Sequence, residues 1–314
     1  MNFLYKKLSL LTIILSISLY YFGCSSTEQT TARLAYIQSE YEKCEKESLI
    51  ETQQNPGNDE GWGYLAMSRI QLGKIDDART AYEQYLKLGK YSLHEEFDNL
   101  FTNQYNQGAQ NYSTASQSKD STQQKKLYTA ALKFFREAQI IYPDSVSVLK
   151  PLGYVSEKLG NNDEALKYFK KAMDSNKNDS TAAESVARLL VTQAPTYLRD
   201  KKFEECINVL KPMLSSALPK TNVMTDLVNF YIGSSYYSWG NDIRSSLPEN
   251  SEDKSYQDKF KDALPYLEPL QNSSNKDIKS SAIAVLISVY GNLGMYDKSK
   301  ELIEIKKQID SENK

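Results

Sequence analysis

The amino-acid sequence predicts an all-α fold built from stacked helical hairpins. Two segments, residues 59–92 and 146–179, repeat one pattern in which small residues recur at fixed places between large apolar ones. This spacing indicates two antiparallel helices that cross closely, because small side chains let the two backbones approach each other. No segment of the sequence shows a convincing strand pattern of alternating polar and apolar residues.

The residues at the fixed places correspond to those of a known repeat. In the two segments they include Trp62, Gly73, Ala78, Gly153, Gly160 and Ala165. This pattern resembles the tetratricopeptide repeat (TPR), a helix–turn–helix unit of about 34 residues. The resemblance implies a right-handed TPR-type solenoid of about five to six repeats over residues 33–314, with long loops inserted in two of them.

Residues 1–23 are predicted to be a signal peptide. Lys6 and Lys7 precede an apolar stretch, residues 8–22, which is shorter than the roughly 20 apolar residues of a membrane-spanning helix. Gly23 and Cys24 resemble the end of a bacterial lipobox, in which the cysteine is lipidated and becomes the mature N-terminus. Ordinary signal cleavage and an uncleaved anchor are the alternatives.

A polar segment follows the predicted lipidation site. Residues 24–32 are expected to form a flexible tether between the lipid and the folded body. The residue after Cys24 is Ser25 and not the Asp that retains many such lipoproteins at the inner membrane, so the resemblance favours the outer membrane. The predicted location is therefore the bacterial cell envelope, on the periplasmic or the surface face.

Charge and cysteine content limit the partners and the cross-links that we expect. The formal net charge is −2, with 38 Lys and Arg against 40 Asp and Glu, and no basic stripe indicates nucleic-acid binding. Cys44 and Cys206 both occupy the small place of a second helix, about four repeats apart, whereas a disulfide needs Cα atoms within about 7 Å. We expect both cysteines to be small buried core residues.

The repeat pattern extends on both sides of the first clean segment. Residues 41–54 are expected to form a lone second helix, so that the series opens with a truncated repeat. In the repeat that follows residues 59–92, Gly108 and Ala131 lie 23 residues apart, whereas the corresponding places of the clean repeats lie 5 apart. The polar stretch 111–126 between them is predicted to be a solvated loop, with helical extensions on each side.

The later repeats keep the same phase. Gly233 marks the fifth repeat, in which the polar stretch 242–258 is a second predicted insertion. Gly294 marks the sixth repeat, and a polar helix is expected to end the series.

Three prolines interrupt the helical pattern. Pro195 is expected to end the first helix of the fourth repeat, because proline lacks the N–H that a helix interior uses. Pro212 and Pro269 fall inside predicted second helices, where an interior proline costs about 3 kcal/mol. Those two helices should therefore be short or kinked.

Side chains suited to catalysis or to metal binding are scarce. His94 is the only histidine, and its two glutamate neighbours are typical of a solvated helix start. The sequence holds no phosphate-binding glycine-rich loop and no dinucleotide-binding fingerprint. We therefore predict no catalytic residue, no metal and no cofactor, and we do not expect an enzyme.

Candidate contact residues follow from the TPR resemblance. Members of that family line an inner groove with certain places of each first helix, and these places here include Met67, Ile70, Tyr105, Tyr154, Glu157, Lys158 and Tyr237. The three tyrosines are candidates for a second reason, because tyrosine is enriched at protein interfaces.

These observations predict a non-enzymatic, lipid-anchored scaffold of the bacterial envelope. Its expected partner is an envelope protein or peptide bound in the concave groove, and it reaches the membrane through its lipid anchor. The alternative is a surface lipoprotein that binds a glycan or another small ligand on exposed tyrosines.

Overall fold

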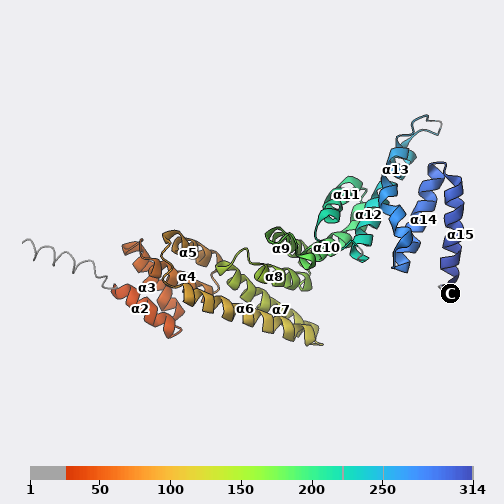
Figure 1. The fold of residues 1–314 in the computed structure, drawn as a ribbon. Coiled ribbons are helices and arrows are strands. Elements are labelled where there is room, and N and C mark those ends of the chain that lie inside the picture. Colours follow the sequence, from red (N-terminus) through yellow and green to blue (C-terminus); the bar gives the residue numbers. More distant parts are fainter. Residues whose placement is uncertain (1–25, 221–222, 250, 313–314) are drawn as a thin grey trace, which may run out of the picture. The chain divides into compact units, whose positions relative to one another are not determined.

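The computed structural model describes residues 26–220, 223–249 and 251–312, and within these ranges it contains helices and no strand (Figure 1). The predicted all-α, TPR-type fold is confirmed. The chain divides into two compact units, Met1–Pro143 and Asp144–Lys314. The organisation of residues 33–314 as one solenoid stays a prediction.

The first unit consists of three helical hairpins. Its helices are α2 (Thr27–Ile37), α3 (Tyr41–Gln54), α4 (Asp59–Gln71), α5 (Ile75–Leu88), α6 (His94–Gln117) and α7 (Ser121–Ile141). Each odd-numbered helix packs against the helix before it, and α4 also packs against α2 and α3. One apolar core runs from Ala32 in α2 to Ile141 in α7.

The second unit consists of four helical hairpins. Its helices are α8 (Val146–Lys158), α9 (Asn162–Ser175), α10 (Ser180–Arg199), α11 (Phe203–Leu210), η1 (Lys211–Ser215), α12 (Val223–Ser246), α13 (Tyr256–Leu267), η2 (Glu268–Asn272), α14 (Lys276–Asn292) and α15 (Tyr296–Glu312), where η denotes a 3₁₀ helix. Helices α8, α10, α12 and α14 are the first helices of these hairpins.

One turn geometry joins the two helices of five hairpins. In each turn one residue adopts a left-handed backbone conformation, with φ between 57° and 81°, and these residues are Ser39, Gly73, Gly160, Lys201 and Gly294. In the turn at Gly160, the Gly160 N–H donates to the Glu157 carbonyl at 2.9 Å and the Asn161 N–H donates to the Ser156 carbonyl at 2.8 Å. The turn therefore binds carbonyls that the end of a helix leaves without partners.

The two helices of a hairpin approach closely at the small residues. A Cβ atom on Gly153 would lie 2.6 Å from the Phe169 ring, and one on Gly233 would lie 2.5 Å from the Leu267 side chain. In these two hairpins a large side chain is thus buried against the bare backbone of the partner helix. The predicted small residues Ala78, Ala131 and Ala165 are all fully buried. Trp62 is half-buried, and its indole N–H donates to the Pro56 carbonyl at 2.9 Å.

The expectation for the cysteines is confirmed. Cys44 and Cys206 are free thiols with fully buried side chains. Each lies five residues after a left-handed turn residue, Ser39 or Lys201, and its backbone N–H donates to the carbonyl of Glu40 or Lys202.

The start of the fold differs from the prediction. Helix α2 begins at Thr27, inside the stretch predicted to be a tether, because the Ser26 hydroxyl caps it by accepting from the Gln29 N–H at 2.9 Å. Ala32 and Ala35 bury its inner face. Residues 41–54 are therefore not a lone helix, and the described residues contain seven hairpins instead of five to six. Residues 1–25, with the predicted signal peptide and Cys24, lie outside the described residues.

The first predicted insertion is helical instead of looped. Only residues 118–120 separate α6 from α7, so most of the stretch 111–126 lengthens these two helices. A Cβ atom on Gly108 would lie 2.7 Å from the Phe135 ring, just as Gly153 faces Phe169. Gly108 therefore occupies the small place inside the first helix, and the sequence-based register of this repeat was wrong.

The prolines have different outcomes. Pro195 lies inside α10, which continues to Arg199, so the expected helix end at Pro195 was wrong. Pro212 and Pro269 each lie in a 3₁₀ segment that follows a short α-helix, as expected. In the fifth repeat α12 continues to Ser246, so part of the predicted insertion 242–258 is also helical.

We predict that the turn residues respond to substitution with opposite signs. Gly160→Ala should lower the free energy of unfolding by about 1–2 kcal/mol, because a left-handed backbone brings Cβ close to the following carbonyl. No atom lies within 4 Å of the new Cβ, so the cost comes from the backbone alone. Ser39→Gly should raise the free energy of unfolding by up to about 1 kcal/mol.

Urea-induced unfolding measures both changes. Gly57→Ala is the matched control, since Gly57 has an ordinary φ and open space around its Cβ position. A cost at Gly160 no greater than that at Gly57 would contradict the account of the turn.

Candidate functional site

Three of the predicted contact residues, Tyr154, Glu157 and Lys158, lie together on the first helix of the second unit. Lys150, Tyr154, Glu157 and Lys158 lie on α8, and Arg188 lies on α10. We refer to these five residues as the α8–α10 face. Its centre is Tyr154, one helical turn from Lys150 and from Glu157 and Lys158.

Two ion pairs hold Lys150, Glu157 and Arg188, which are three of the four charged side chains of this face. The Arg188 guanidinium donates to both carboxylate oxygens of Glu157, with 2.8 Å between Nη2 and Oε2. The bidentate contact raises the pKa of Arg188 above its ordinary value. Both side chains keep partial exposure, so a partner can reach them.

The second ion pair lies at the start of α10. Lys150 Nζ donates to Asp179 Oδ2 and to Thr181 Oγ1, both at 2.8 Å. Asp179 also caps α10, because its Oδ1 accepts from the backbone N–H groups of Thr181 and Ala182 at 3.0 Å. These donors hold the pKa of Asp179 at about 2, although its burial opposes the shift.

The Tyr154 ring packs against a neighbouring aromatic ring and is still partly exposed to solvent. Its ring centroid lies 4.9 Å from that of Phe169 in an edge-to-face arrangement, and the residue is half-buried. The neighbouring Lys158 is exposed. Tyr154 therefore presents a ring whose orientation is fixed, which suits it as an interface anchor.

Arg188 and Asp179 were not among the residues predicted from the sequence. The sequence did point to Arg188. Counted from Ser180, it occupies the ninth place of the repeat, which is one of the places that line the groove in the family. Asp179 directly precedes that helix, as an N-cap residue does.

The other two candidate tyrosines lie in different surroundings. Tyr105, on α6, packs between Phe101 and Phe135, with ring centroids 6.0 and 5.7 Å away. Tyr237, on α12, packs against Phe260 at 5.9 Å and belongs to a different core cluster from Tyr154. Both rings are half-buried, so each one is partly exposed, on a different helix from Tyr154.

Met67 and Ile70 are not available to a partner. Both side chains are 0% exposed in the core of the first unit. The prediction that they line a groove was wrong, because both side chains belong to the apolar core that the helices of this unit share.

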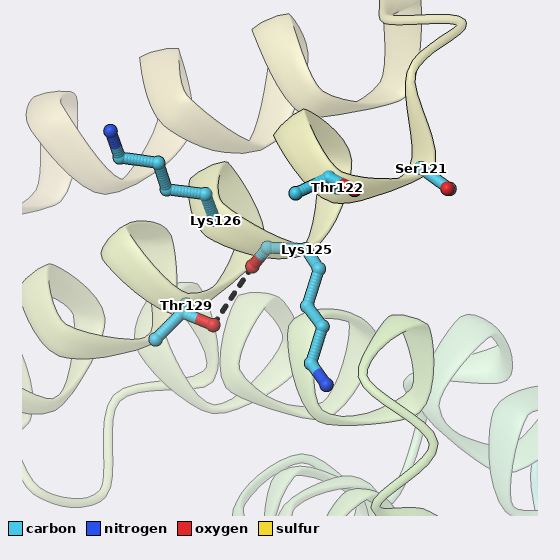
Figure 2. Close-up of a pocket in the computed structure, with 5 residues that line it drawn as sticks. All are labelled: Ser121, Thr122, Lys125, Lys126 and Thr129. Atoms are coloured by element: carbon cyan, nitrogen blue, oxygen red, sulfur yellow. Dashed lines mark hydrogen bonds between the residues drawn. The ribbon is translucent and has the colours of Figure 1, made fainter.

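A surface depression on α7 offers no convergent chemistry. It is lined by Ser121, Thr122, Lys125, Lys126 and Thr129 (Figure 2). The two lysine ammonium groups point away from each other in Figure 2, so they do not form one anion site. Within the described ranges, no group of three His, Cys, Asp or Glu side chains could hold a metal ion. His94 is exposed, with Nε2 3.6 Å from Asp98 Oδ2.

Comparison with protein families identifies two repeats directly. Residues 64–88 and residues 152–179 match models of the tetratricopeptide repeat, so both clean segments of the sequence contain TPR repeats. TPR repeats generally bind protein or peptide partners and are generally not catalytic. The second match includes most of α8 and all of α9, and it therefore contains Tyr154, Glu157 and Lys158.

Solved TPR structures are similar to this chain at low sequence identity. TTC0263, a thermophilic TPR protein of Thermus thermophilus, has 20% identity over 67% of this chain and 98% of its own, with a TM-score of 0.31. The C-terminal part of a TPR repeat-containing protein of Cytophaga hutchinsonii has 11% identity over 90% and 95%, with a TM-score of 0.40. YrrB, a TPR protein with an unusual peptide-binding site, has 16% identity over 70% and 91%, with a TM-score of 0.26. The curated proteins include no match.

We predict that Asp179→Asn destabilises the second unit in a pH-dependent way. The amide keeps an oxygen for the cap but loses the charge that pairs with Lys150, so the free energy of unfolding should fall by about 1–2 kcal/mol at pH 7. The folded state lowers the pKa of this carboxyl from 3.8 to about 2, so its contribution is present above pH 3.8 and is lost as the pH falls through about 2.

Urea denaturation of the wild type and of Asp179→Asn measures the difference in their free energies of unfolding. It is done at pH 7 and at the lowest pH where both proteins fold. A difference that stays constant between the two conditions would show that the new amide harms the cap and that the ion pair contributes nothing.

Proposed function

We propose that this chain is a non-enzymatic scaffold that binds a protein or peptide segment on the first helices of its second unit. The observation that supports this proposal best is the α8–α10 face, where charged groups are held in place and still reach solvent. TPR repeats with this general role occupy the same part of the chain.

Fixed side chains favour binding because less conformational freedom is lost on association. Arg188 is held by two hydrogen bonds to Glu157, and Lys150 is held by Asp179 and Thr181. A partner that pairs with these groups therefore avoids part of the cost of ordering long side chains, about 0.5–1.5 kcal/mol for each. The face carries both signs of charge, so we expect a partner segment that offers both an acidic and a basic group near an apolar residue facing Tyr154.

Site-specific photo-crosslinking in the native cell tests this proposal. A photoreactive amino acid replaces Lys158, which is exposed on α8, and in a matched variant it replaces Lys170, which is exposed on α9. We expect one defined cross-linked protein from position 158 and none from position 170.

Two further substitutions test whether the α8–α10 face is the surface that binds the cross-linked protein. Arg188→Gln and Tyr154→Ser should each weaken the cross-link at position 158 several-fold, with unchanged protein level and helix content. Equal cross-linking at positions 158 and 170 would exclude the α8–α10 face as the binding surface.

We also propose that the chain is a lipoprotein of the bacterial envelope, anchored through Cys24 and directed to the outer membrane. The support is the sequence alone: two lysines, an apolar stretch at residues 8–22, and Gly23 before Cys24. Among the described residues, no helix has both the length and the apolar character that crossing a bilayer requires. The proposed anchor residue lies outside the described range.

Metabolic labelling with an alkyne fatty acid tests the anchor. The wild-type chain should carry the label and sediment with membranes, whereas Cys24→Ser should lose the label. Cys44→Ser is the matched control, since that thiol is buried in the folded protein. Label that persists in Cys24→Ser would refute lipidation at this residue.

A further inference from the structure

The first unit contains a buried carboxyl group that the proposed binding face does not use. Glu137, on α7, is 2% exposed and lines a cavity of about 200 Å³ between α7 and the start of α5. The other residues that line this cavity are Gly73, Ile75, Thr129, Leu132, Lys133 and Arg136. α5 and α7 are second helices of their hairpins, so the cavity lies apart from any first-helix face.

Within the described residues, the Glu137 carboxylate accepts no hydrogen bond. Its one charged neighbour at ion-pair distance is Lys133 Nζ, 3.9 Å from Oε1, and that lysine side chain is 59% exposed. The same ammonium lies 5.9 Å from the centre of the Phe134 ring. Lys133 therefore does not supply the close hydrogen bonds that a buried carboxylate needs.

A buried carboxylate without a close partner is costly. Burial raises the pKa of Glu137 to about 7, although Lys133 acts in the opposite direction. Among the described residues, the ionised form therefore has Lys133 at 3.9 Å and no hydrogen-bond donor. A cation bound in the cavity would stabilise that form.

We propose that this cavity binds the ammonium group of a lysine side chain presented by a protein partner, with the charge at Glu137. Ile75 and Leu132 supply apolar walls for the aliphatic stem. The Thr129 hydroxyl donates to the Lys125 carbonyl at 2.8 Å, as Figure 2 shows, so its oxygen is free to accept a hydrogen bond from the ammonium. The cavity thus offers several acceptors to a group that has three donors.

A lysine fits this set of residues better than a metal ion does. Glu137 is the one carboxylate among the lining residues, and metal sites are built from several such ligands. Lys133 and Arg136 on α7 also face the cavity, whereas the residues contributed by the α5 side, Gly73 and Ile75, carry no charge. The two flanking cations would select a slender stem that reaches past them to the carboxylate. The inference rests on the proposed scaffold function only for the source of the lysine.

Calorimetric titration of the full-length protein with n-butylammonium chloride, a lysine side-chain analogue, tests the cavity itself. At pH 8 we expect saturable millimolar binding, and we expect n-butanol, which has the same stem without the charge, to bind at least tenfold more weakly. At pH 6 the affinity for n-butylammonium should be about tenfold lower, because a carboxyl with a pKa of about 7 is then mostly protonated.

Variants assign the binding to Glu137. Glu137→Gln should bind n-butylammonium at least tenfold more weakly at pH 8, and it should fold well because it removes a buried charge. Glu83→Gln, the same change at an exposed position on α5, should bind like the wild type. Equal affinities for Glu137→Gln and the wild type, or for n-butanol and n-butylammonium, would overturn the proposal. Binding seen only in Lys133→Met would overturn it too, since Lys133 would then be the occupant of the cavity. All of these outcomes are independent of the cross-linking test of the α8–α10 face.

Discussion

The close approach of two helices within each hairpin is the constraint on which the rest of the structure depends. A ring or a branched side chain on the second helix lies directly on the backbone of the first, as Phe169 does on Gly153 and Leu267 on Gly233. A larger side chain at one of these contacts would have to displace a neighbouring side chain. Because the hairpin is fixed in this way, the outward-facing residues of the first helix keep a constant direction, and Tyr154 becomes a defined part of a surface.

Much of the fold was predictable because its constraints are local. Gly73, Gly160 and Gly294 stand where the turn needs a left-handed residue, and the small places of the next helices follow five residues later. The same count located the buried thiols of Cys44 and Cys206. Composition was a poorer guide to the stretch 111–126, which is mostly helical. Its serine, threonine and glutamine residues are also typical of loops, and its weak apolar periodicity gave no sign of a helix.

The candidate site was predictable only in part, because exposure depends on which helices pack together. Met67 and Ile70 have the right places for a groove, but both are fully buried in the core of the first unit. Glu157 lies partly exposed on α8, and its partner Arg188 belongs to the next hairpin. Pairing between side chains 31 residues apart cannot be seen in a local pattern, so the sequence showed separate charges where the structure has an ion pair.

The burial of the two thiols also bears on redox chemistry. A thiol reacts with oxidants and disulfides as its thiolate, and burial raises the pKa of Cys44 to about 11 and moves that of Cys206 in the same direction. At neutral pH almost none of either sulfur is ionised, and neither is open to a reagent. The folded chain can therefore pass through an oxidising compartment with both cysteines reduced, without forming mixed disulfides with other proteins.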